Sequence, residues 1–346
     1  MTRTWLLAPA TVLAGLFLAG AAEAATLDDV RTAGKVRCGI STGLAGFSDL
    51  NANQEWEGLD VDFCKAVAAA VLGDAKKVEF VPLTNKERFT ALQSGEVELL
   101  ARNTTWTLTR DSNLGLDFTG VNYYDGQGFM VPRALNVNSA LELGGARICI
   151  KTGTTTELNL ADYFRANDLE AFQPVLLTDD AEVRRNYVAE ACDAYTTDAS
   201  ALAAMRSTLP DPTAHIILPE IISKEPLGPV VRQGDDQWAD IVRWALNAMI
   251  TAEEYGVTSA NVDEVRTSSE SPEIRRLLGV KETAEEEGLG TMLGLSDDFA
   301  YQIVKQVGNY SESFERHIGV NTPIGLERGL NALWSEGGIL YAPPMR

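Results

Sequence analysis

The sequence predicts a two-lobed α/β protein with a double-strand hinge and a helical C-terminal extension. Three observations lead to this prediction. Apolar segments of strand length alternate with segments of helical periodicity, which is the pattern of βαβ units and a mainly parallel sheet. The pattern runs through residues 36–101 and starts again after residue 134. The length of 346 residues also suits about two domains.

The first lobe is predicted to begin with a strand and to alternate from there. Its strands are Val36–Ile40, Lys77–Val81 and Val97–Ala101. Its helices are Asp60–Leu72, with Asp60 as the N-cap, and Lys86–Gln93. Because ligands gather beyond the carboxyl ends of parallel strands, the residues that follow each strand are the first candidates for a binding site.

The second lobe repeats this alternation. Its predicted strands are Arg147–Ile150, Pro174–Leu177, Asp193–Tyr195 and His215–Leu218. Its predicted helices are Thr155–Arg165, Asp180–Ala189 and Ser200–Met205. The chain is expected to cross between the lobes near Gly128–Arg133 and again near Gly228–Arg232, which makes a double hinge.

Beyond residue 237 the chain turns helical. Asp240–Glu254 has apolar residues at helical spacing, so one face of this helix is expected to lie in the core. We therefore divide the chain into lobe 1 (25–130 and 230–270), lobe 2 (131–229) and a helical extension (271–346) that packs on lobe 1.

The first 24 residues have the features of a secretory signal peptide. Arg3 supplies a positive charge, and the apolar run Trp5–Leu18 is short for a membrane helix. Ala22-Glu23-Ala24 matches the A-x-A cleavage pattern, so the mature chain is expected to start at Ala25. A retained N-terminal anchor is the alternative, but no cysteine follows the cleavage site for lipidation.

Export changes the interpretation of the four cysteines. In an oxidising compartment they are expected to form disulfides, although four buried free thiols are the alternative. We predict one local bridge in each lobe, Cys38–Cys64 and Cys149–Cys192, because the members of each pair are close in sequence. Each bridge is expected to add about 2–4 kcal/mol by restricting the unfolded chain.

Composition argues against several classes of protein. The 49 acidic and 29 basic residues leave a net charge of −20, which would repel nucleic acid. With two histidines far apart and no C-x-x-C pair, no metal site is expected. The chain has no G-x-x-x-x-G-K or G-x-S-x-G motif, so we expect no cofactor and no catalytic residues.

The densest polar motif is Arg102–Asp111, which reads Arg-Asn-Thr-Thr-Trp-Thr-Leu-Thr-Arg-Asp and follows a predicted buried strand. Its hydroxyls, amide and guanidinium groups form a surface rich in hydrogen-bond donors. An arginine binds a carboxylate through two parallel charge-assisted hydrogen bonds. The alternative is a polar turn that contains a structural ion pair.

Two further motifs follow strands of the second lobe. Lys151–Glu157 places glycine and threonines at a helix start, where free backbone N–H groups attract an anion, and Thr154 with Glu157 fits a capping box. Plain capping is the alternative. Asp193–Asp198 ends in a carboxylate that can hold an ammonium group, although Asp198 also fits the N-cap of the next helix.

The three motifs together match a free α-amino acid. They supply an arginine for a carboxylate, a helix start that accepts an anion, and an acid for an ammonium group. They are spread over both predicted lobes. A free α-amino acid carries one carboxylate and one ammonium group at about this separation.

With these motifs, the chain resembles the periplasmic substrate-binding proteins of polar amino-acid ABC transporters, solute-binding protein family 3. Within these it is most similar to the general L-amino-acid or glutamate/glutamine/aspartate/asparagine group. The resemblance covers nearly the whole mature chain and implies a periplasmic-binding-protein type II fold, also called a Venus-flytrap. The stretches that carry it are Gly58–Cys64, Arg88–Glu96, Arg102–Asp111, Gly153–Glu157, Cys192–Asp198, Pro272–Gly279 and Tyr341–Pro344.

The resemblance implies a role for each matching residue. Arg110 would bind the ligand α-carboxylate, assisted by the Thr105 hydroxyl and amide. Asp198 and the backbone carbonyl of Asn103 would hold the α-ammonium group. Thr154, with the amides of the helix start, would close on the carboxylate from the second lobe.

Four further positions fall where relatives line the side-chain pocket. They are Asn85, Arg88, Lys151 and Thr197. Arg88 and Lys151 favour acidic or amide ligand side chains, because an arginine at the Arg88 position meets the distal carboxylate in glutamate- and aspartate-binding relatives. Solvated surface pairs are the alternative for these two cations.

The chain departs from some relatives around the side-chain pocket. It lacks the acid that basic-amino-acid binders carry near Ser41, and it lacks aromatic residues near Leu44 and Asn85. An aromatic sandwich over the ligand is therefore in doubt, with Trp106 or Tyr195 as substitutes unless both belong to the core.

The resemblance implies a function without catalysis. The protein would bind free L-amino acids in the periplasm, close around them and deliver them to the permease subunits of an ABC transporter, as a monomer. The expected ligands are glutamate, glutamine, aspartate and asparagine, or a broader set. The alternative is a periplasmic cyclohexadienyl or arogenate dehydratase on the same fold, with Glu157 as a candidate acid. A sensor module is a third interpretation.

Overall fold

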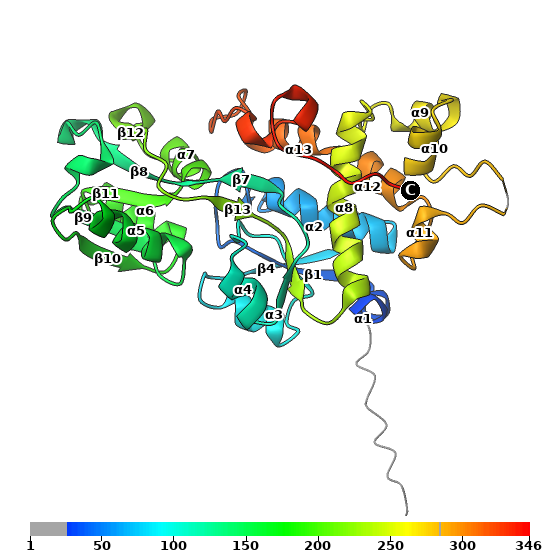
Figure 1. The fold of residues 1–346 in the computed structure, drawn as a ribbon, viewed down its shortest axis with the longest axis horizontal. Helices are drawn as coiled ribbons and strands as arrows, with labels where there is room; N and C mark the ends of the chain where they lie inside the picture. The colour runs from blue at the N-terminus through cyan, green and yellow to red at the C-terminus, as the bar shows by residue number, and fades with distance from the viewer. Residues whose placement is uncertain (1–25, 284) are drawn as a thin grey trace, which may run out of the picture.

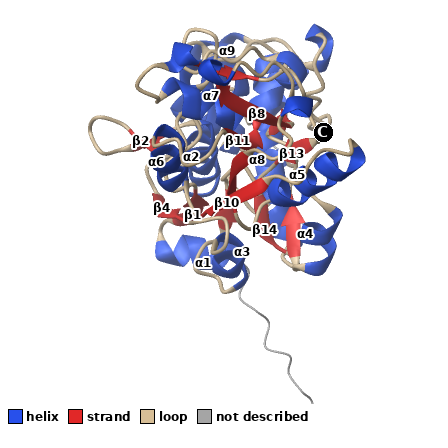
Figure 2. Ribbon diagram, turned by 90° about the vertical axis from the view of Figure 1, so that its left-hand side faces the viewer, coloured by secondary structure: helices blue, strands red, loops and turns tan. Residues whose placement is uncertain are grey.

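The computed structural model describes residues 26–283 and 285–346, so the predicted signal peptide lies outside the described residues. Two five-stranded sheets form the framework, with order β4-β1-β5-β14-β6 in one and β10-β9-β11-β8-β12 in the other. We call the parts built on these sheets lobe 1 and lobe 2. In Figure 1 lobe 2 lies at the left and the lobe 1 strands β1 and β4 lie near the centre, and Figure 2 shows the strands inside the surrounding helices.

Lobe 1 has a mixed sheet. β1 pairs in parallel with β4 and β5, whereas β14 runs antiparallel to both β5 and β6. Its strands are β1 (Val36–Ile40), β4 (Val78–Pro82), β5 (Leu99–Leu100), β6 (Leu116–Phe118) and β14 (Val230–Arg232). Its helices are α1 (Thr26–Ala33), α2 (Leu59–Leu72), α3 (Arg88–Gln93), α4 (Leu108–Asn113) and α8 (Asp236–Glu254). A small hairpin pairs β2 (Asp49–Leu50) with β3 (Trp56–Glu57).

Lobe 2 has the same kind of mixed sheet. β9 pairs in parallel with β10 and β11, and β8 runs antiparallel to β11 and β12. Its strands are β8 (Gln127–Pro132), β9 (Arg147–Lys151), β10 (Gln173–Leu177), β11 (Ala194–Asp198) and β12 (His215–Ile217). Its helices are α5 (Thr155–Ala166), α6 (Asp180–Val188) and α7 (Ala199–Ser207), with 3-10 turns η1 (Arg133–Leu135), η2 (Ala140–Glu142) and η3 (Pro212–Ala214).

Two short antiparallel strands connect the lobes. They are β7 (Tyr123–Asp125) and β13 (Glu225–Leu227), and Figure 1 shows them between the two ends of the molecule. Both lie before the segments where the sequence predicted the crossings, because those segments form β8 and β14 inside the large sheets. The glycines and prolines there mark strand ends rather than the hinge itself.

The C-terminal part is helical, as predicted. It contains α9 (Val262–Ser268), α10 (Pro272–Leu277), α11 (Leu289–Met292), α12 (Phe299–Gln306) and α13 (Tyr310–His317), followed by 3-10 turns η4 (Gly329–Asn331) and η5 (Trp334–Glu336). α12 and α13 pack on α2 and α8 (Figure 1). Their apolar faces join the main hydrophobic core of lobe 1.

Both predicted disulfides are confirmed. Cys38 is bonded to Cys64, and Cys149 to Cys192, and all four side chains are buried. Each bridge ties a central strand of one sheet to a neighbouring segment of the same lobe. No free cysteine remains among the described residues.

The predicted N-cap at Asp60 is wrong. α2 begins at Leu59, after Gly58, whose φ is +132°. A Cβ at Gly58 would lie 2.2 Å from the Phe47 carbonyl oxygen, so only glycine fits this turn. Asp60 instead turns inward and accepts hydrogen bonds from the Asn103 amide at 3.1 Å and from Asn122 Nδ2 at 3.3 Å.

The extension is tied to lobe 1 by a buried polar cluster around Asp62. Asp62 Oδ2 is 2.8 Å from His317 Nε2, 3.0 Å from the Ser313 hydroxyl and 3.3 Å from Arg316 Nη2. Burial alone would raise the pKa of Asp62, but His317, Arg316 and Lys65 hold it below the usual value.

We expect Asp62→Asn to lower the free energy of unfolding by about 2 kcal/mol, because the buried carboxylate accepts several charge-assisted hydrogen bonds. The folded-state pKa is depressed, so this stabilisation is present above about pH 4 and is lost as the pH falls through the folded pKa. Urea unfolding of both proteins between pH 3 and pH 7 measures the difference. A difference that is as large at pH 3 as at pH 7 contradicts the assignment.

Candidate functional site

All nine sequence-predicted ligand-binding residues line one cleft. The cleft has a volume of about 270 Å³ and also includes Thr155 and Thr156. The nine residues are Asn85, Arg88, Asn103, Thr105, Arg110, Lys151, Thr154, Thr197 and Asp198. The first five belong to lobe 1 and the last four to lobe 2, so the cleft lies between the lobes.

The lobe 1 wall is fastened to the hinge. After β5 the chain lies against β13, where the Gly228 amide donates to the Thr104 carbonyl at 3.0 Å and the Trp106 amide donates to the Pro226 carbonyl at 2.8 Å. Asn103 has a φ of +42°, a left-handed conformation that asparagine tolerates better than most residues. This turn starts the polar motif directly beyond the strand end.

Two guanidinium groups face the cleft from this wall. Arg110 Nη1 donates to the Thr105 carbonyl at 2.9 Å, and its guanidinium lies 5.3 Å from the centre of the Phe89 ring. Arg88 Nη1 donates to the Thr104 hydroxyl at 3.3 Å, and its Nη2 donates across the cleft to the Gly153 carbonyl at 3.5 Å. Among the described residues, none accepts from Arg88 Nε.

Burial is the main cause of the low arginine pKa values. It lowers the pKa of Arg88 well below the usual value, and the neighbouring charges of Arg102 and Arg110 lower it further. It also lowers the pKa of Arg110, against the opposing effects of Glu225 and Asp198. Positive charge concentrated in this way favours an anionic group in the cleft.

The lobe 2 wall includes the start of α5. The predicted capping box is not formed: the Thr154 hydroxyl donates to the Lys151 carbonyl at 2.7 Å, and Glu157 accepts from the Gly153 amide at 3.4 Å. Gly153 has a φ of +76°, and this tight turn brings those groups together. No side chain caps α5, so its first backbone N–H groups remain available to an anion.

Asp198 lies at the start of α7 but does not cap it. Its carboxylate makes no capping bond, whereas the Ser200 amide donates to Asp125 at 3.3 Å and 3.4 Å. Burial and the carboxylates of Asp125 and Glu225 raise the pKa of Asp198 to about 8, with Lys151 and Asn103 opposing. Lys151 is paired with Asp180, and Asp198 forms no salt bridge among the described residues, although its charge raises the pKa values of Arg88 and Arg110.

Lys151 and Asn85 each have a buried partner behind the cleft. Lys151 Nζ lies 2.6 Å from Asp180 Oδ1, and both side chains are buried. Burial alone would lower the pKa of Lys151, but Asp180 raises it to about 12. Asn85 Oδ1 accepts from Arg102 Nη1 at 2.8 Å, which directs the amide Nδ2 away from Arg102.

Several residues of the site were not predicted from sequence. Glu225 accepts hydrogen bonds from Thr105 at 2.6 Å and from Thr155 at 2.9 Å, one from each wall. Asp180 is likewise a buried partner of Lys151, and the half-buried Asp125 raises the pKa of Asp198. No sequence motif surrounds them, and their proximity in space to the predicted residues is the only signal that could have found them.

Neither aromatic candidate covers the cleft. Trp106 stacks on Phe118 with ring centres 5.7 Å apart and faces a separate surface groove. Tyr195 is buried in the lobe 2 core. The cleft is therefore lined by polar side chains, without an aromatic sandwich.

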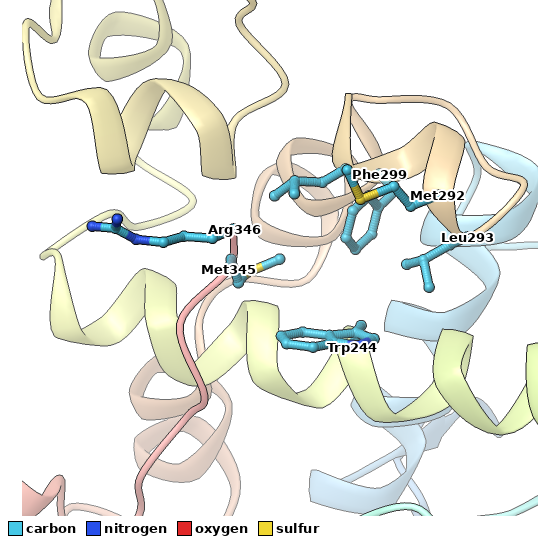
Figure 3. A pocket seen from close by; sticks show the side chains of 7 residues that line it. Trp244, Met292, Leu293, Phe299, Met345 and Arg346 are labelled. Carbon is cyan, nitrogen blue, oxygen red and sulfur yellow. The ribbon is translucent and has the colours of Figure 1, made fainter. Parts of the chain in front are cut away.

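A larger cavity of about 380 Å³ lies elsewhere, between α8, α11 and the end of the chain. Figure 3 shows its side chains, which are mostly apolar; they are Trp244, Leu289, Met292, Leu293, Phe299, Met345 and Arg346. It lacks the convergent polar groups that define ligand orientation, so the inter-lobe cleft is the better candidate. No cluster within residues 26–283 and 285–346 is arranged to hold a metal ion.

The fold and the cleft define a two-lobed binding protein, and comparison with known proteins gives its family. Residues 36–261 match the family model described as bacterial extracellular solute-binding proteins, family 3. The chain belongs to this family, whose fold is the periplasmic-binding-protein type II fold. No helix in the described part of the chain is both long and apolar enough to cross a bilayer.

Close relatives cover nearly the whole chain. The glutamate/glutamine/aspartate/asparagine-binding protein BztA of Rhodobacter capsulatus is 57% identical over 97% of this chain and 98% of its own. The general L-amino acid-binding periplasmic protein AapJ of Rhizobium johnstonii is 58% identical over 95% of both chains. These relatives are named as binding proteins, and the chain is a binding protein rather than a dehydratase.

A solved structure shares the fold throughout. A periplasmic binding protein from Brucella ovis, with glutathione bound, is 56% identical and superposes with a TM-score of 0.90. The match covers 94% of this chain and 100% of that one. The C-terminal extension is therefore included in the shared architecture.

We expect Lys151→Met to lower the free energy of unfolding by about 3–5 kcal/mol, because it leaves Asp180 as an unpaired buried carboxylate. Replacing both residues, with Asp180→Leu added, is expected to restore most of that loss. Lys35→Met is the matched control, since Lys35 pairs with Glu79 on the surface and should cost under about 1 kcal/mol. An equal loss of unfolding free energy in Lys151→Met and Lys35→Met would contradict a larger contribution from the buried pair.

Proposed function

We propose that this protein binds free L-amino acids through the inter-lobe cleft and delivers them to an ABC transporter. The observation that carries the proposal is that a buried carboxylate, Asp198, which forms no salt bridge within the described part of the chain, and a guanidinium group, Arg110, line one closed cleft. An α-amino acid supplies the opposite charge to each. BztA and AapJ, which are named as amino-acid-binding proteins, support this assignment.

The α-carboxylate is assigned to Arg110 and to the start of α5. Arg110 uses one nitrogen to bind the Thr105 carbonyl, so its remaining donors serve the ligand. Thr154 and the free N–H groups of α5 approach from lobe 2. The Thr105 hydroxyl already donates to Glu225, so Thr105 is expected to contribute its backbone amide rather than its hydroxyl.

The α-ammonium group is assigned to Asp198 and to the Asn103 carbonyl. An ammonium group beside Asp198 stabilises the carboxylate form that burial and two neighbouring acids disfavour. Asn103 lines the cleft at a tight turn with positive φ, which supports its carbonyl as the second acceptor.

The ligand side chain is assigned to Arg88, Asn85, Lys151 and Thr197. Arg88 Nε has no acceptor in the part of the chain that the structure describes. Because Arg102 binds the Asn85 oxygen, the Asn85 Nδ2 group is expected to donate to the ligand. Donors of this kind suit a distal carboxylate or the carbonyl of an amide, which favours glutamate, glutamine, aspartate and asparagine. The charge of Lys151 is already balanced by Asp180, so Arg88 is expected to discriminate between ligand side chains more strongly than Lys151 does.

Closure of the lobes is the proposed mechanism. Each wall supplies part of the ligand's partners, so a ligand gains all of them only when the lobes meet about β7 and β13. Closure excludes water and strengthens the charged contacts. We further propose the division into lobe 1 (25–130 and 230–270), lobe 2 (131–229) and an extension (271–346), a cleaved signal peptide, a monomeric state and docking on permease subunits.

A second ligand class is favoured by one observation. The Brucella ovis structure contains glutathione, whose γ-glutamyl end carries the free α-carboxylate and α-ammonium groups of glutamate. The same anchors in this chain would hold that end. Glutathione is therefore included in the test below.

The mature protein, refolded to remove bound ligand, should show raised melting temperatures with L-amino acids, because a ligand that binds only the folded state stabilises it. Isothermal titration then ranks glutamate, glutamine, alanine and glutathione. Arg110→Met is expected to weaken all four, whereas Arg88→Met should weaken glutamate by about tenfold or more and alanine little. The absence of any shift with amino acids or glutathione would overturn the proposal.

Binding should also depend on pH. In the closed cleft without a ligand, burial and the neighbouring acids raise the pKa of Asp198 to about 8, and an ammonium ligand favours its charged form. We expect proton release on binding, and an affinity for L-glutamine that rises up to about tenfold per pH unit between pH 6 and pH 8. Titration in buffers of different ionisation enthalpy counts the protons, and Asp198→Asn should abolish the release. An equal proton count in the variant would contradict the role of Asp198.

A further inference from the structure

Glu225 is a buried carboxylate that both lobes share. Its side chain is 1% exposed. Oε2 accepts from the Thr105 hydroxyl at 2.6 Å and from the Thr155 hydroxyl at 2.9 Å. Oε1 accepts from Asn159 Nδ2 at 2.7 Å and from the Ser223 hydroxyl at 2.6 Å. Both oxygens of the carboxylate are therefore fully used by the protein.

The donors come from three different parts of the structure. Thr105 belongs to the lobe 1 wall, Thr155 and Asn159 belong to α5 of lobe 2, and Ser223 lies just before the hinge strand β13, which begins at the acceptor Glu225. The two threonine hydroxyls lie 3.4 Å apart across the cleft. These bonds form together only when the walls meet, because opening the cleft separates Thr105 from Thr155.

The charges around Glu225 make this closure dependent on a cation. Asp125 lies directly opposite Glu225 in the hinge sheet, and like charges in that position repel. Asp198 is also close enough for Glu225 to raise its pKa. Arg110 is the one guanidinium in the cleft whose pKa Glu225 raises, and it is assigned to the ligand carboxylate. A ligand ammonium group adds the positive charge that this cluster of acids lacks.

We propose that Glu225 is a positioning residue that latches the two lobes behind the bound ligand, an inference that rests on the proposed function. It does not line the cleft itself. Its bonds hold Thr105 and Thr155, which do line the cleft, in the closed arrangement. Because the latch contacts no ligand atom, its loss weakens every ligand by a similar factor and acts mainly on the rate of dissociation.

The test compares Glu225→Gln with a matched control, Glu98→Gln. Glu98 is also a buried carboxylate, but its partner Arg37 lies within lobe 1. Stopped-flow and titration measurements use L-glutamate and L-glutamine as probes. Glu225→Gln should raise the dissociation rate of both by about tenfold or more, with the ratio of their affinities unchanged, because charge-assisted hydrogen bonds are lost. Glu98→Gln should leave both rates unchanged.

A milder variant guards against a folding defect in Glu225→Gln. Thr155→Val keeps the shape and the backbone amide but removes the hydroxyl donor. It should also raise the dissociation rates, and adding Glu225→Gln to it should have less than the combined effect of the two single changes. Small-angle X-ray scattering should show a smaller ligand-induced decrease in the radius of gyration for both variants than for the wild type.

The outcomes separate this inference from the proposed function. A wild-type protein that binds neither probe, nor any other amino acid, overturns the proposed function and the latch with it. A wild-type protein that binds, while Glu225→Gln and Thr155→Val release both probes at the wild-type rate, overturns the latch alone. A change in the affinity ratio of the probes would also overturn it, since that result requires direct contact with the ligand side chain.

Discussion

The closed cleft buries charged side chains of both signs in a small volume, and the rest of the structure is arranged so that each finds a partner. Lys151 has Asp180, and Asp60 accepts from the Asn103 amide. Glu225 is satisfied by hydroxyls and an amide. Asp198 is the exception among the carboxylates at the cleft, because it forms no salt bridge with any described residue and because burial, Asp125 and Glu225 raise its pKa more than Lys151 and Asn103 lower it. That imbalance supports the proposed binding of a zwitterion.

The helical C-terminal extension also contacts the hinge directly. The Asn331 side chain accepts from the Tyr124 amide at 2.7 Å and donates to the Tyr124 carbonyl at 3.1 Å, so it occupies one edge of the hinge strand β7. The Tyr310 hydroxyl donates to the Asn122 carbonyl at 2.7 Å just before that strand. The helical extension thus supports lobe 1 and one strand of the hinge, while β13 stays close to the cleft through Thr105 and Glu225.

Much of the site was predictable because its residues follow strands. The ends of neighbouring strands place Asn103 and Arg110 on one side of the cleft. In the other lobe, strand ends place Lys151, Thr154 and Asp198 on the opposite side. The two disulfides were predictable because their cysteines lie close in sequence. Partners that belong to other segments, such as Asp180 for Lys151 and Glu225 for Thr105, leave no local pattern. The capping role given to Asp60 failed because Asn103 and Asn122, which are distant in sequence, bind its side chain. The role given to Thr154 failed because its hydroxyl donates to the nearby Lys151 carbonyl.

The sequence by itself determined the alternation of strands and helices, the two-lobed α/β architecture, the helical end and the types of polar group at each strand end. Those features depend on periodicity and on residues near one another in the chain. Only the tertiary structure decided that the sheets are mixed, that the connecting strands are β7 and β13, and which buried charges pair. Strand direction and charge pairing depend on contacts between distant segments, and burial gives those contacts their energetic weight.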